Sequence, residues 1–428
     1  MNWPIATLGR VVLMVGGGTP SKQNDTFWNG TIPWVSPKDM RDREIRDADD
    51  HITEAALDGS ATQVVPVGSV LVVVRSGILV RRLPIAITRA PVALNQDMKA
   101  LLPGGPLIPE FLAYALEARA EYVLAECVKR GATVHSIDVG KFQQMQLPVP
   151  AEPEQRRIVE ILDQADALRR LRAEADAKAE RVLPALFLKI FGDPATNPKG
   201  WRVLEMGNVL ESSNYGSMIP PSAEGTWLDI RVANIQDGKL DLSSKKYIEL
   251  DERTIGKHSL RDGDILLARA IGSREHLGKA IVVYPGKDRW AFDSHLMRVR
   301  VRQEQVLPEY VTAFLASRSG RREFLSRTRA SVVQFNINTT EFASIRIPVP
   351  PIESQNRFKR DALLFLEHNR RTIVVDQKLD ALFACLLSRA FSGGLTASWR
   401  TAHMKELLQE MEQQSSALSC PVEPEVHA

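Results

Sequence analysis

Cysteine is scarce in this chain of 428 residues, and its scarcity excludes several classes of protein. The three cysteines, Cys127, Cys385 and Cys420, are scattered, which argues against a disulfide scaffold and a cysteine-rich zinc site. The eight histidines show no metal-ligand spacing, so we expect no bound metal. Such sparing use of cysteine is typical of a reducing compartment, and we expect a cytoplasmic protein.

Long hydrophobic runs and a strong excess of one charge are also missing. The longest apolar run, Val70–Val74, ends at Arg75 and is far shorter than the roughly 20 residues of a membrane helix. The N-terminus, MNWPIATLGR, does not resemble a signal peptide, and we expect no membrane partner. Lys and Arg number 55 against 52 Asp and Glu, a net charge of +3. This balance argues against a polycationic coat for DNA and leaves a local basic face possible.

Sequence motifs for catalysis are absent as well. The glycine cluster Gly16–Gly18 is followed by Pro20, which predicts a tight turn after a strand instead of a nucleotide loop. GxxxxGK[ST], Gly-x-Ser-x-Gly and the tetrapeptides used by amino-methyltransferases do not occur. Asp97-Met98-Lys99 is too short to indicate a nuclease centre. We therefore expect no catalytic residue, no cofactor and no enzyme activity of the chain's own.

What the sequence does contain is an internal repeat. IDVGKFQQMQLPVPAEPEQRRI (137–158) aligns without a gap to INTTEFASIRIPVPPIESQNRF (337–358), 200 positions later. Pro-Val-Pro, Gln155/Gln355 and Arg157/Arg357 are identical in the two segments. A period near 200 is too long for a solenoid, so each copy is a domain with a connector. We infer a tandem duplication.

The same order of elements is expected in both copies. Short β-branched runs between turn residues come first, then a short helix beginning at Pro109 or Pro308, then a strand ending in Pro-Val-Pro. A helix of about 37 residues, roughly 55 Å long, follows each strand. These patterns predict an α+β fold with two similar mixed α/β domains separated by two long antiparallel, coiled-coil-like helices, although a core helix of an all-α domain is the alternative. The expected boundaries are 1–150 (first domain), 151–192 (central helix), 193–350 (second domain), 351–394 (distal helix) and 395–428 (tail).

Pro184 lies near the end of the first long helix. Because proline lacks a backbone donor and its ring clashes with the preceding turn, we expect a kink or break there.

Cationic and amide side chains recur in corresponding loops of both copies. Residues 318–329 carry five arginines and one acid, and a run of Gln and Asn follows. Arg and Lys suit phosphates and guanine, and Asn and Gln suit adenine edges. The candidate DNA-binding residues are Lys22, Trp28, Lys38, Arg41, Arg75, Arg81, Arg82, Lys129, Arg130, Arg231, Asn234, Arg269, Arg274, Lys279, Arg327, Arg329, Gln334, Asn336 and Asn338.

Several of these segments resemble the specificity subunits of type I restriction–modification systems. GGGTPSKQNDTFWNGTIPWVSPKDM (16–40) is similar to the opening of that family's target-recognition domains, and LPVPAEPEQRRIVEILD (147–163) to its central conserved helix. TWLDIRVANIQDGKLD (226–241), LRDGDILLARAIGSREHLGKA (260–280) and QFNIN (334–338) are similar to a second type of recognition domain. The resemblance covers about residues 5–400; one departure is Ser354, where the family usually has Glu.

The resemblance implies a subunit that reads a split, asymmetric site in double-stranded DNA, with one domain on each half-site. It also implies two methyltransferase subunits and motor–nuclease restriction subunits as partners, with adenine methylation carried out by the partners. On the long helices, the candidate partner-binding residues are Gln155, Arg157, Ile161, Leu168, Gln355, Arg357, Leu366 and Leu379.

Three other interpretations remain open at this point. The chain could be a self-contained DNA methyltransferase or nuclease, which would need a cofactor or a metal. It could be a structural protein without a DNA role. It could also read DNA within a different modification or phage-defence system.

Overall fold

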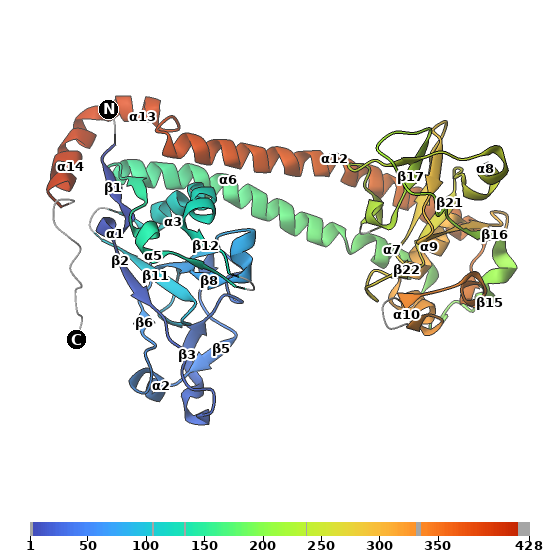
Figure 1. The fold of residues 1–428 in the computed structure, drawn as a ribbon, viewed down its shortest axis with the longest axis horizontal. Helices are drawn as coiled ribbons and strands as arrows, with labels where there is room; N and C mark the ends of the chain where they lie inside the picture. The colour runs from blue at the N-terminus through green and yellow to red at the C-terminus, as the bar shows by residue number, and fades with distance from the viewer. Residues whose placement is uncertain (1–2, 105–106, 132–133, 237, 331–334, 418–428) are drawn as a thin grey trace. The chain divides into compact units, whose positions relative to one another are not determined.

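A computed structural model of the chain describes residues 3–104, 107–131, 134–236, 238–330 and 335–417 (Figure 1). The chain divides into two units. Unit 1 consists of Met1–Leu171 together with Asp376–Ala428, and unit 2 consists of Arg172–Val375. Unit 1 therefore combines segments from both ends of the sequence.

Unit 1 is built on a five-stranded sheet. Its strands, in spatial order, are β2 (Val12–Gly16), β11 (Met98–Pro103), β7 (Val70–Val73), β9 (Ile85–Thr88) and β4 (Glu44–Ile45). All four residues of the central strand β7 are buried, which suits its β-branched sequence. Helix α3 (Pro109–Ala118) packs on β9, β7 and β11. A second sheet has the order β5 (Asp50–Ile52), β3 (Trp28–Val35), β10 (Val92–Leu94) and β6 (Val64–Val65).

Unit 2 repeats this topology. Its larger sheet has the order β16 (Leu210–Tyr215), β25 (Leu296–Val301), β21 (Asp264–Ala268) and β23 (Ala280–Val283), with α9 (Pro308–Ala316) packed on β23 and β21. Its second sheet has the order β20 (Tyr247–Ile248), β17 (Trp227–Ile230) and β24 (Trp290–Phe292). The pair β17–β24 is parallel, as is β3–β10, while the outer strands β20 and β5 pair antiparallel. The predicted tandem duplication and mixed α/β fold are confirmed.

The glycine that follows β2 also has a counterpart in unit 2. A Cβ on Gly17 would lie 2.1 Å from the Asn95 carbonyl oxygen, and one on Gly216 would lie 2.1 Å from that of Asp293. Backbone passes so close at both places that only glycine fits. The strand predicted before the glycines is observed as β2, whereas residues 17–20 after it form no regular element, and the tight turn stays a prediction.

The two long helical segments differ in continuity. The first consists of α6 (Glu152–Ala179) and α7 (Val182–Phe191), whereas the second, α12 (Ile352–Phe391), is unbroken. The break at residues 180–181 lies just before Pro184, which cannot donate to the carbonyl of Glu180. The expected effect of Pro184 is confirmed.

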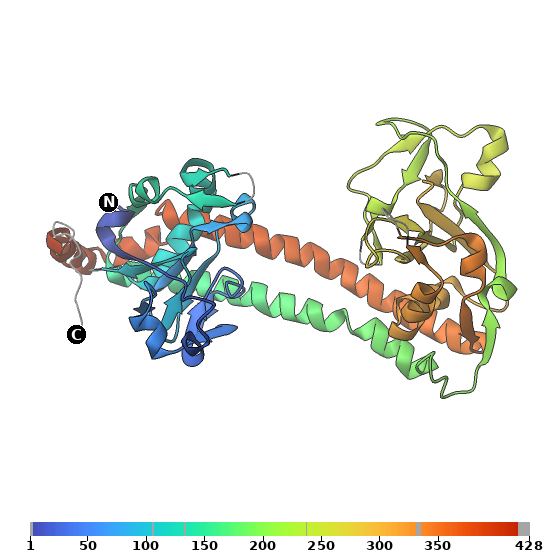
Figure 2. The same cartoon turned by 60° about the horizontal axis from the view of Figure 1, so that its bottom comes forward.

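In unit 1, the helical segments run antiparallel. Glu154 accepts a hydrogen bond from Thr396 at 2.6 Å, and Arg169 donates to Asp380 at 2.9 Å. The residue numbers of the partners thus decrease as those along α6 increase, which is the antiparallel order. Both views show α6 beside the end of α12 (Figures 1 and 2).

Each unit takes part of its core from the helix that ends the other copy of the repeat. In unit 1, the ring of Phe391 from α12 lies 5.3 Å from that of Phe111 on α3. In unit 2, the ring of Phe191 from α7 lies 4.7 Å from that of Tyr310 on α9. Both pairs belong to the main hydrophobic cluster of their unit, so each domain needs a helix from outside its own repeat.

A buried glutamine fixes the start of each long helix to its own domain. Gln355 is completely buried; its Oε1 accepts from the Leu307 backbone N–H at 2.7 Å, and its Nε2 donates to the Pro350 carbonyl at 2.8 Å. Gln155 makes the same contacts with Ile108 (3.0 Å) and Pro150 (2.8 Å). The identity of these glutamines in the repeat thus has an internal structural cause.

We predict that Gln355→Ala lowers the free energy of unfolding of unit 2 by about 2–3 kcal/mol, because buried backbone groups lose their partners. Urea unfolding of the full chain measures this change. The exposed neighbour Asn356→Ala is the control and should change stability by less than about 0.5 kcal/mol. Equal effects of the two substitutions would contradict the role assigned to Gln355.

Candidate nucleic-acid interface

A small three-stranded sheet gathers predicted cations in unit 1. Its order is β12 (Val128–Lys129), β13 (His135–Ile137) and β8 (Arg75–Ser76), and its register places Lys129 and Arg75 on either side of Ser136. Arg81 and Arg82 follow the short helix η2 (Gly77–Val80), which packs against β13, and Arg130 follows β12 directly. Segments more than 40 residues apart therefore bring five exposed cations to one sheet.

These cations differ in their partners. Lys129 forms an ion pair with Asp138 at 2.9 Å. Within the residues that the structure describes, Arg75, Arg81, Arg82 and Arg130 make no ion pair. Their charges are therefore available to an external anion.

Unit 2 has the corresponding sheet. Its order is β26 (Arg329–Ala330), β27 (Phe335–Asn336) and β22 (Ala270–Ile271), with Arg329 and Ala270 on either side of Asn336. Arg329 and Asn336 lie 200 positions after Lys129 and Ser136. Arg269 immediately precedes β22 and Arg327 lies two residues before β26, so four predicted residues meet here. Gln334 lies outside the described residues.

Two arginines of this second sheet are paired with acids. Arg329 forms an ion pair with Glu341, and Arg327 lies 3.2 Å from Glu323. Arg269 is held differently: its Nε donates to the Ser294 carbonyl at 2.9 Å, and its guanidinium lies 4.1 Å from the centroid of the Tyr215 ring. Its charge is thus positioned without a carboxylate among these contacts.

Arg274 and Lys279 belong to the loop after β22. Arg274 is exposed and Lys279 is partly exposed. Arg321 of α10 (Arg318–Ser326) donates hydrogen bonds of 2.9 Å to the carbonyls of Arg274 and Glu275. One arginine of the predicted basic run therefore shapes this loop.

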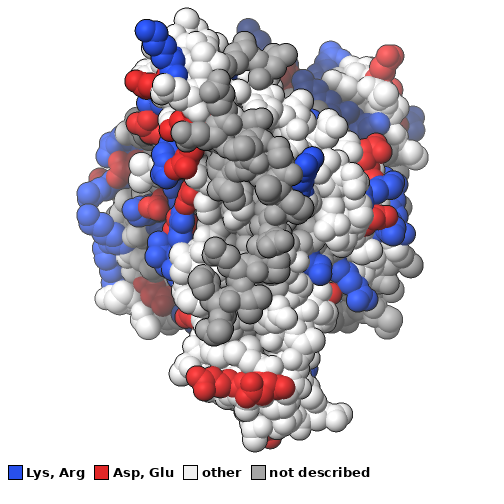
Figure 3. Space-filling model, turned by 90° about the vertical axis from the view of Figure 1, so that its left-hand side faces the viewer, with Lys and Arg blue, Asp and Glu red and all other residues white. Residues whose placement is uncertain are grey.

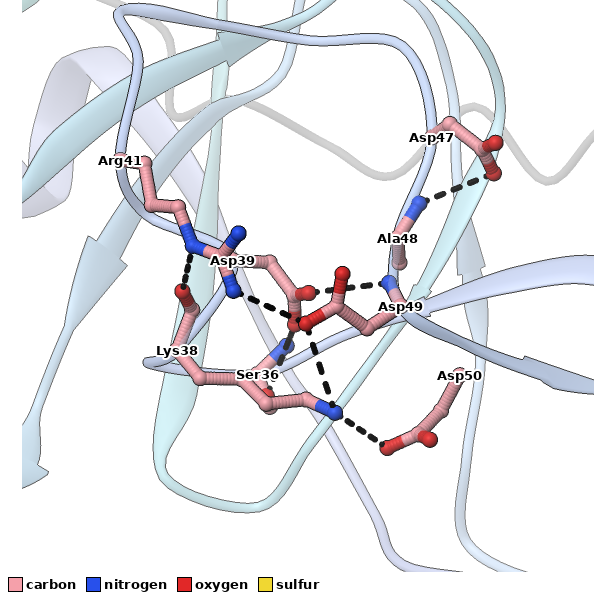
Figure 4. Close-up of polar contacts among 8 residues, drawn as sticks. All are labelled: Ser36, Lys38, Asp39, Arg41, Asp47, Ala48, Asp49 and Asp50. Atoms are coloured by element: carbon pink, nitrogen blue, oxygen red, sulfur yellow. Dashed lines mark hydrogen bonds and ion pairs between the residues drawn. The ribbon is translucent and has the colours of Figure 1, made fainter. Parts of the chain in front are cut away.

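Lys38 and Arg41 of unit 1 lie within an acidic loop (Figure 4). The Nζ of Lys38 is 2.9 Å from Asp50 and 3.8 Å from Asp49, and Arg41 is 3.0 Å from Asp49. The hydrogen bond with Asp50 raises the pKa of Lys38. Because both cations are already paired, DNA contact would require these ion pairs to rearrange. Lys22 is exposed on the turn after β2.

Four other candidates have structural roles in the fold. The indole of Trp28 donates to the Ser21 carbonyl and packs edge-to-face on Trp34, with 5.2 Å between centroids. Asn234 is buried and bonds to the Asp241 carbonyl, while Arg231 donates to the Ser244 carbonyl at 3.4 Å. Asn338 caps helix α11 (Thr339–Ala343) by accepting from the Glu341 N–H at 2.8 Å.

The candidate partner-binding residues fall into three groups. Gln155 and Gln355 are buried by the contacts described above and present no surface. Leu168 and Leu366 are 52% and 39% exposed, which is unusual for leucine on a helix. The remaining residues are partly or fully exposed: Arg157, Ile161, Arg357 and Leu379.

Charge on the face drawn in Figure 3 is mixed, with Lys and Arg standing among Asp and Glu. This agrees with the near-neutral composition. In the described ranges, no group of three or more His, Cys, Asp and Glu is placed to hold a metal. None of the described helices is both long and apolar enough to cross a membrane.

Sequence reasoning did not find one feature of unit 2. A cavity of about 850 Å³ lies at the end of β16, and among its lining residues only Arg269 was predicted. The others include Met218, Lys257 and His258, which share no motif. Nothing in their spacing indicates that they meet.

Comparison with known proteins supports the reading of these units. Residues 1–181 and 198–358 match the family described as type I restriction modification DNA specificity domain. Over 163 residues the chain is 44% identical to the EcoR124I/EcoR124II specificity subunit of Escherichia coli, covering 38% of this chain and 40% of that protein. It is 24% identical to the StySPI specificity subunit of Salmonella potsdam, covering 70% and 68% of the two chains.

A solved structure shares the fold. The S subunit of a type I system from M. genitalium matches with a TM-score of 0.55 at 13% identity, covering 91% of this chain and 96% of that one. Another, from a study of complex assembly of the type I R-M system, matches with a TM-score of 0.56 at 18% identity, covering 92% and 98%.

We predict that the double substitution Arg81→Gln/Arg82→Gln weakens DNA binding of the assembled complex on every sequence. The slope of log affinity against log salt should fall in magnitude by about 2, since two phosphate contacts are lost. Fluorescence anisotropy at several salt concentrations measures it. The matched control, Arg10→Gln/Arg119→Gln, removes two exposed arginines elsewhere in unit 1. If the control lowers the slope of log affinity against log salt by the same amount, the small sheet has no special role in DNA binding.

Proposed function

Because this chain belongs to the type I restriction modification DNA specificity family, we propose that it is the sequence-specific DNA-binding subunit of a type I restriction–modification complex. Each unit reads one half of a split, asymmetric site. The observation that supports this most directly is the small sheet found in both units. Its framework is the same, but Arg75, Ser136 and Lys129 of unit 1 correspond to Ala270, Asn336 and Arg329 of unit 2.

This difference is what an asymmetric target requires. Arginines at the edges of the sheets bind phosphates and fix the position of the duplex, while amide or guanidinium groups read base edges. Two units with one framework and different side chains read two different short sequences. A symmetric reader would instead repeat the side chains along with the framework.

The chain performs no catalysis in this proposal. Two methyltransferase subunits bind the long helices, and each takes an adenine of one half-site out of the duplex into its own active site. Motor–nuclease subunits join the same assembly. Exposed leucines suit such docking in each unit: Leu168 and Leu171 (62% exposed) on α6 and Leu364 (63%) on α12. The complex works in the cytoplasm, without a cofactor held by this chain.

Methylome sequencing of the host tests the central proposal. Expression of the chain with its methyltransferase subunits should produce methylated adenines in one bipartite, asymmetric motif. Deletion of the gene for this chain should remove that methylation. Methylation that persists unchanged without the chain would refute the proposal.

We predict that inserting four residues within Ala173–Ala179 of α6 changes the gap between the two half-sites while leaving the half-sites unchanged. The reason is that one added helical turn (~5.4 Å) exceeds the rise of one base pair. Sequencing of methylated motifs measures both quantities. An altered half-site would show that the helix does not set the spacing.

The same proposal predicts that the purified chain alone does not bind S-adenosylmethionine. Isothermal titration of the cofactor into the chain measures this, with the assembled methyltransferase complex as the positive control. Saturable binding by the chain alone would favour the alternative of a self-contained methyltransferase.

A further inference from the structure

The cavity in unit 2 lies where three parts of the fold meet. One wall is the end of β16 and the loop after it, residues 213–220, and another is helix α8 (Glu252–His258). Arg269, Ser294 and Thr339 complete the lining. Arg269 and Thr339 adjoin the small sheet of unit 2, so the cavity continues the candidate interface.

The lining carries positive charge and no carboxylate. Lys257 and Arg269 both face this cavity, and no Asp or Glu is among its lining residues. Lys257 is exposed and makes no ion pair within the part of the chain that the structure describes. Arg269 is held in place by the Ser294 carbonyl and the Tyr215 ring, as described above. Two cations in a lining without a carboxylate favour an anionic ligand.

His258 adds a hydrogen-bonding group to the same lining. Its Nδ1 is buried and has no hydrogen-bond partner among the described residues. Burial, with the nearby charges of Lys257 and Arg298, lowers the pKa of His258. The ring is thus neutral at pH 7, although the nearby Tyr215 backbone and Asp251 act to raise the pKa of His258.

The rim of the cavity is apolar. Met218 is 88% exposed and Ile219 is 41% exposed, and Pro220 follows them. The loop that carries them is well anchored: the Ser217 N–H donates to the Phe292 carbonyl at 2.8 Å, and the Ile219 N–H donates to the Ser217 hydroxyl at 3.0 Å. A fixed loop that holds a methionine in solvent is suited to burying it against a partner.

We propose that this cavity extends the surface with which unit 2 binds its half-site: Lys257 and Arg269 bind a backbone phosphate while Met218 and Ile219 lie against the bases in the adjoining groove of the duplex. The proposal rests on the proposed function, because it places DNA on unit 2. Apolar side chains contact the thymine methyl group or wedge between base steps, and cations beside them neutralise phosphates. The apolar rim therefore contributes to which sequence is read, and the cations contribute to affinity on any sequence.

Two substitutions separate these contributions. Lys257→Gln should weaken binding of the assembled complex about five-fold near 0.15 M salt, equally on specific and unrelated duplexes, and lower the salt slope by about 1. Met218→Ala should weaken binding roughly ten-fold on a duplex carrying the methylated motif, with little change on an unrelated duplex. Anisotropy with both duplexes measures the two effects.

Matched controls lie elsewhere in unit 2. Lys287→Gln removes an exposed lysine outside the cavity lining, and Val203→Ala trims an exposed apolar side chain on β15 (Arg202–Glu205). Both should leave binding unchanged. The proposal is overturned if Lys257→Gln and Met218→Ala leave DNA affinity unaltered, or if the controls lose as much affinity as these two variants. DNA binding by the wild-type complex in the same experiment still upholds the proposed function. A wild-type complex that binds no duplex would overturn both.

A further measurement does not depend on affinity. Mild peroxide treatment oxidises exposed methionines, and mass spectrometry quantifies each sulfoxide. A duplex that carries the methylated motif should slow oxidation of Met218 at least several-fold. Met404 of the C-terminal helix α14 (Met404–Ala417) should oxidise at the same rate with and without the duplex. Equal oxidation of Met218 with and without the duplex would overturn the proposal.

A titration with inorganic phosphate tests whether the cavity binds DNA or a free anion that offers the same charge. Titration of phosphate into the full chain should show no saturable binding, since DNA supplies phosphate together with bases for the rim. Saturable phosphate binding that Lys257→Gln abolishes would instead assign the cavity to a free anion and overturn its assignment to DNA.

Discussion

Neither copy of the repeat completes its hydrophobic core with its own residues, and this constraint governs the rest of the structure. Phe391, from the end of the second copy, packs on Phe111 of unit 1, and Phe191, from the end of the first copy, packs on Tyr310 of unit 2. The buried glutamines Gln155 and Gln355 fix the opposite ends of the helices to their own domains. Each long helix is thus bonded to one domain where it starts and buried in the other where it ends. The long helices are therefore parts of the two hydrophobic cores as well as connectors.

Duplication also supports the proposal that one chain reads two different sequences. The sheets, their order and the close backbone approach at Gly17 and Gly216 are shared, because backbone packing demands them. Backbone packing does not fix the side chains on the small three-stranded sheets, and these side chains differ between the two units. Lys38 and Arg41, by contrast, are neutralised by acids of their own loop, so the unpaired arginines of the edge sheet are the better candidates in unit 1.

Residue patterns predicted the scaffold, while the DNA-binding residues remain predictions. The repeat, the position of Pro184 and the Pro-Val-Pro strands follow from local chemistry, and the structure agrees with them. Trp28, Asn234 and Asn338 are predicted to bind DNA, and their hydrogen-bonding groups also make contacts within the fold. Tryptophan and asparagine have the same polar atoms in both roles, so composition cannot separate a side chain that faces DNA from one that closes a turn. Ser354, which corresponds to Glu154 of the first copy, leaves the helix start intact because the neighbouring Gln355 provides the hydrogen bonds. In unit 1, Glu154 bonds to Thr396 and Arg400.

The sequence by itself determined that there are two similar α/β domains and two long helices, because periodicity, proline and internal identity act over short distances along the chain. Only the tertiary structure decided which cations are unpaired, which amides are buried and where Met218, Lys257 and Arg269 meet around one cavity. These properties depend on contacts between segments tens of residues apart. Strand register and core packing set such contacts, and neither is written in the local pattern of residues.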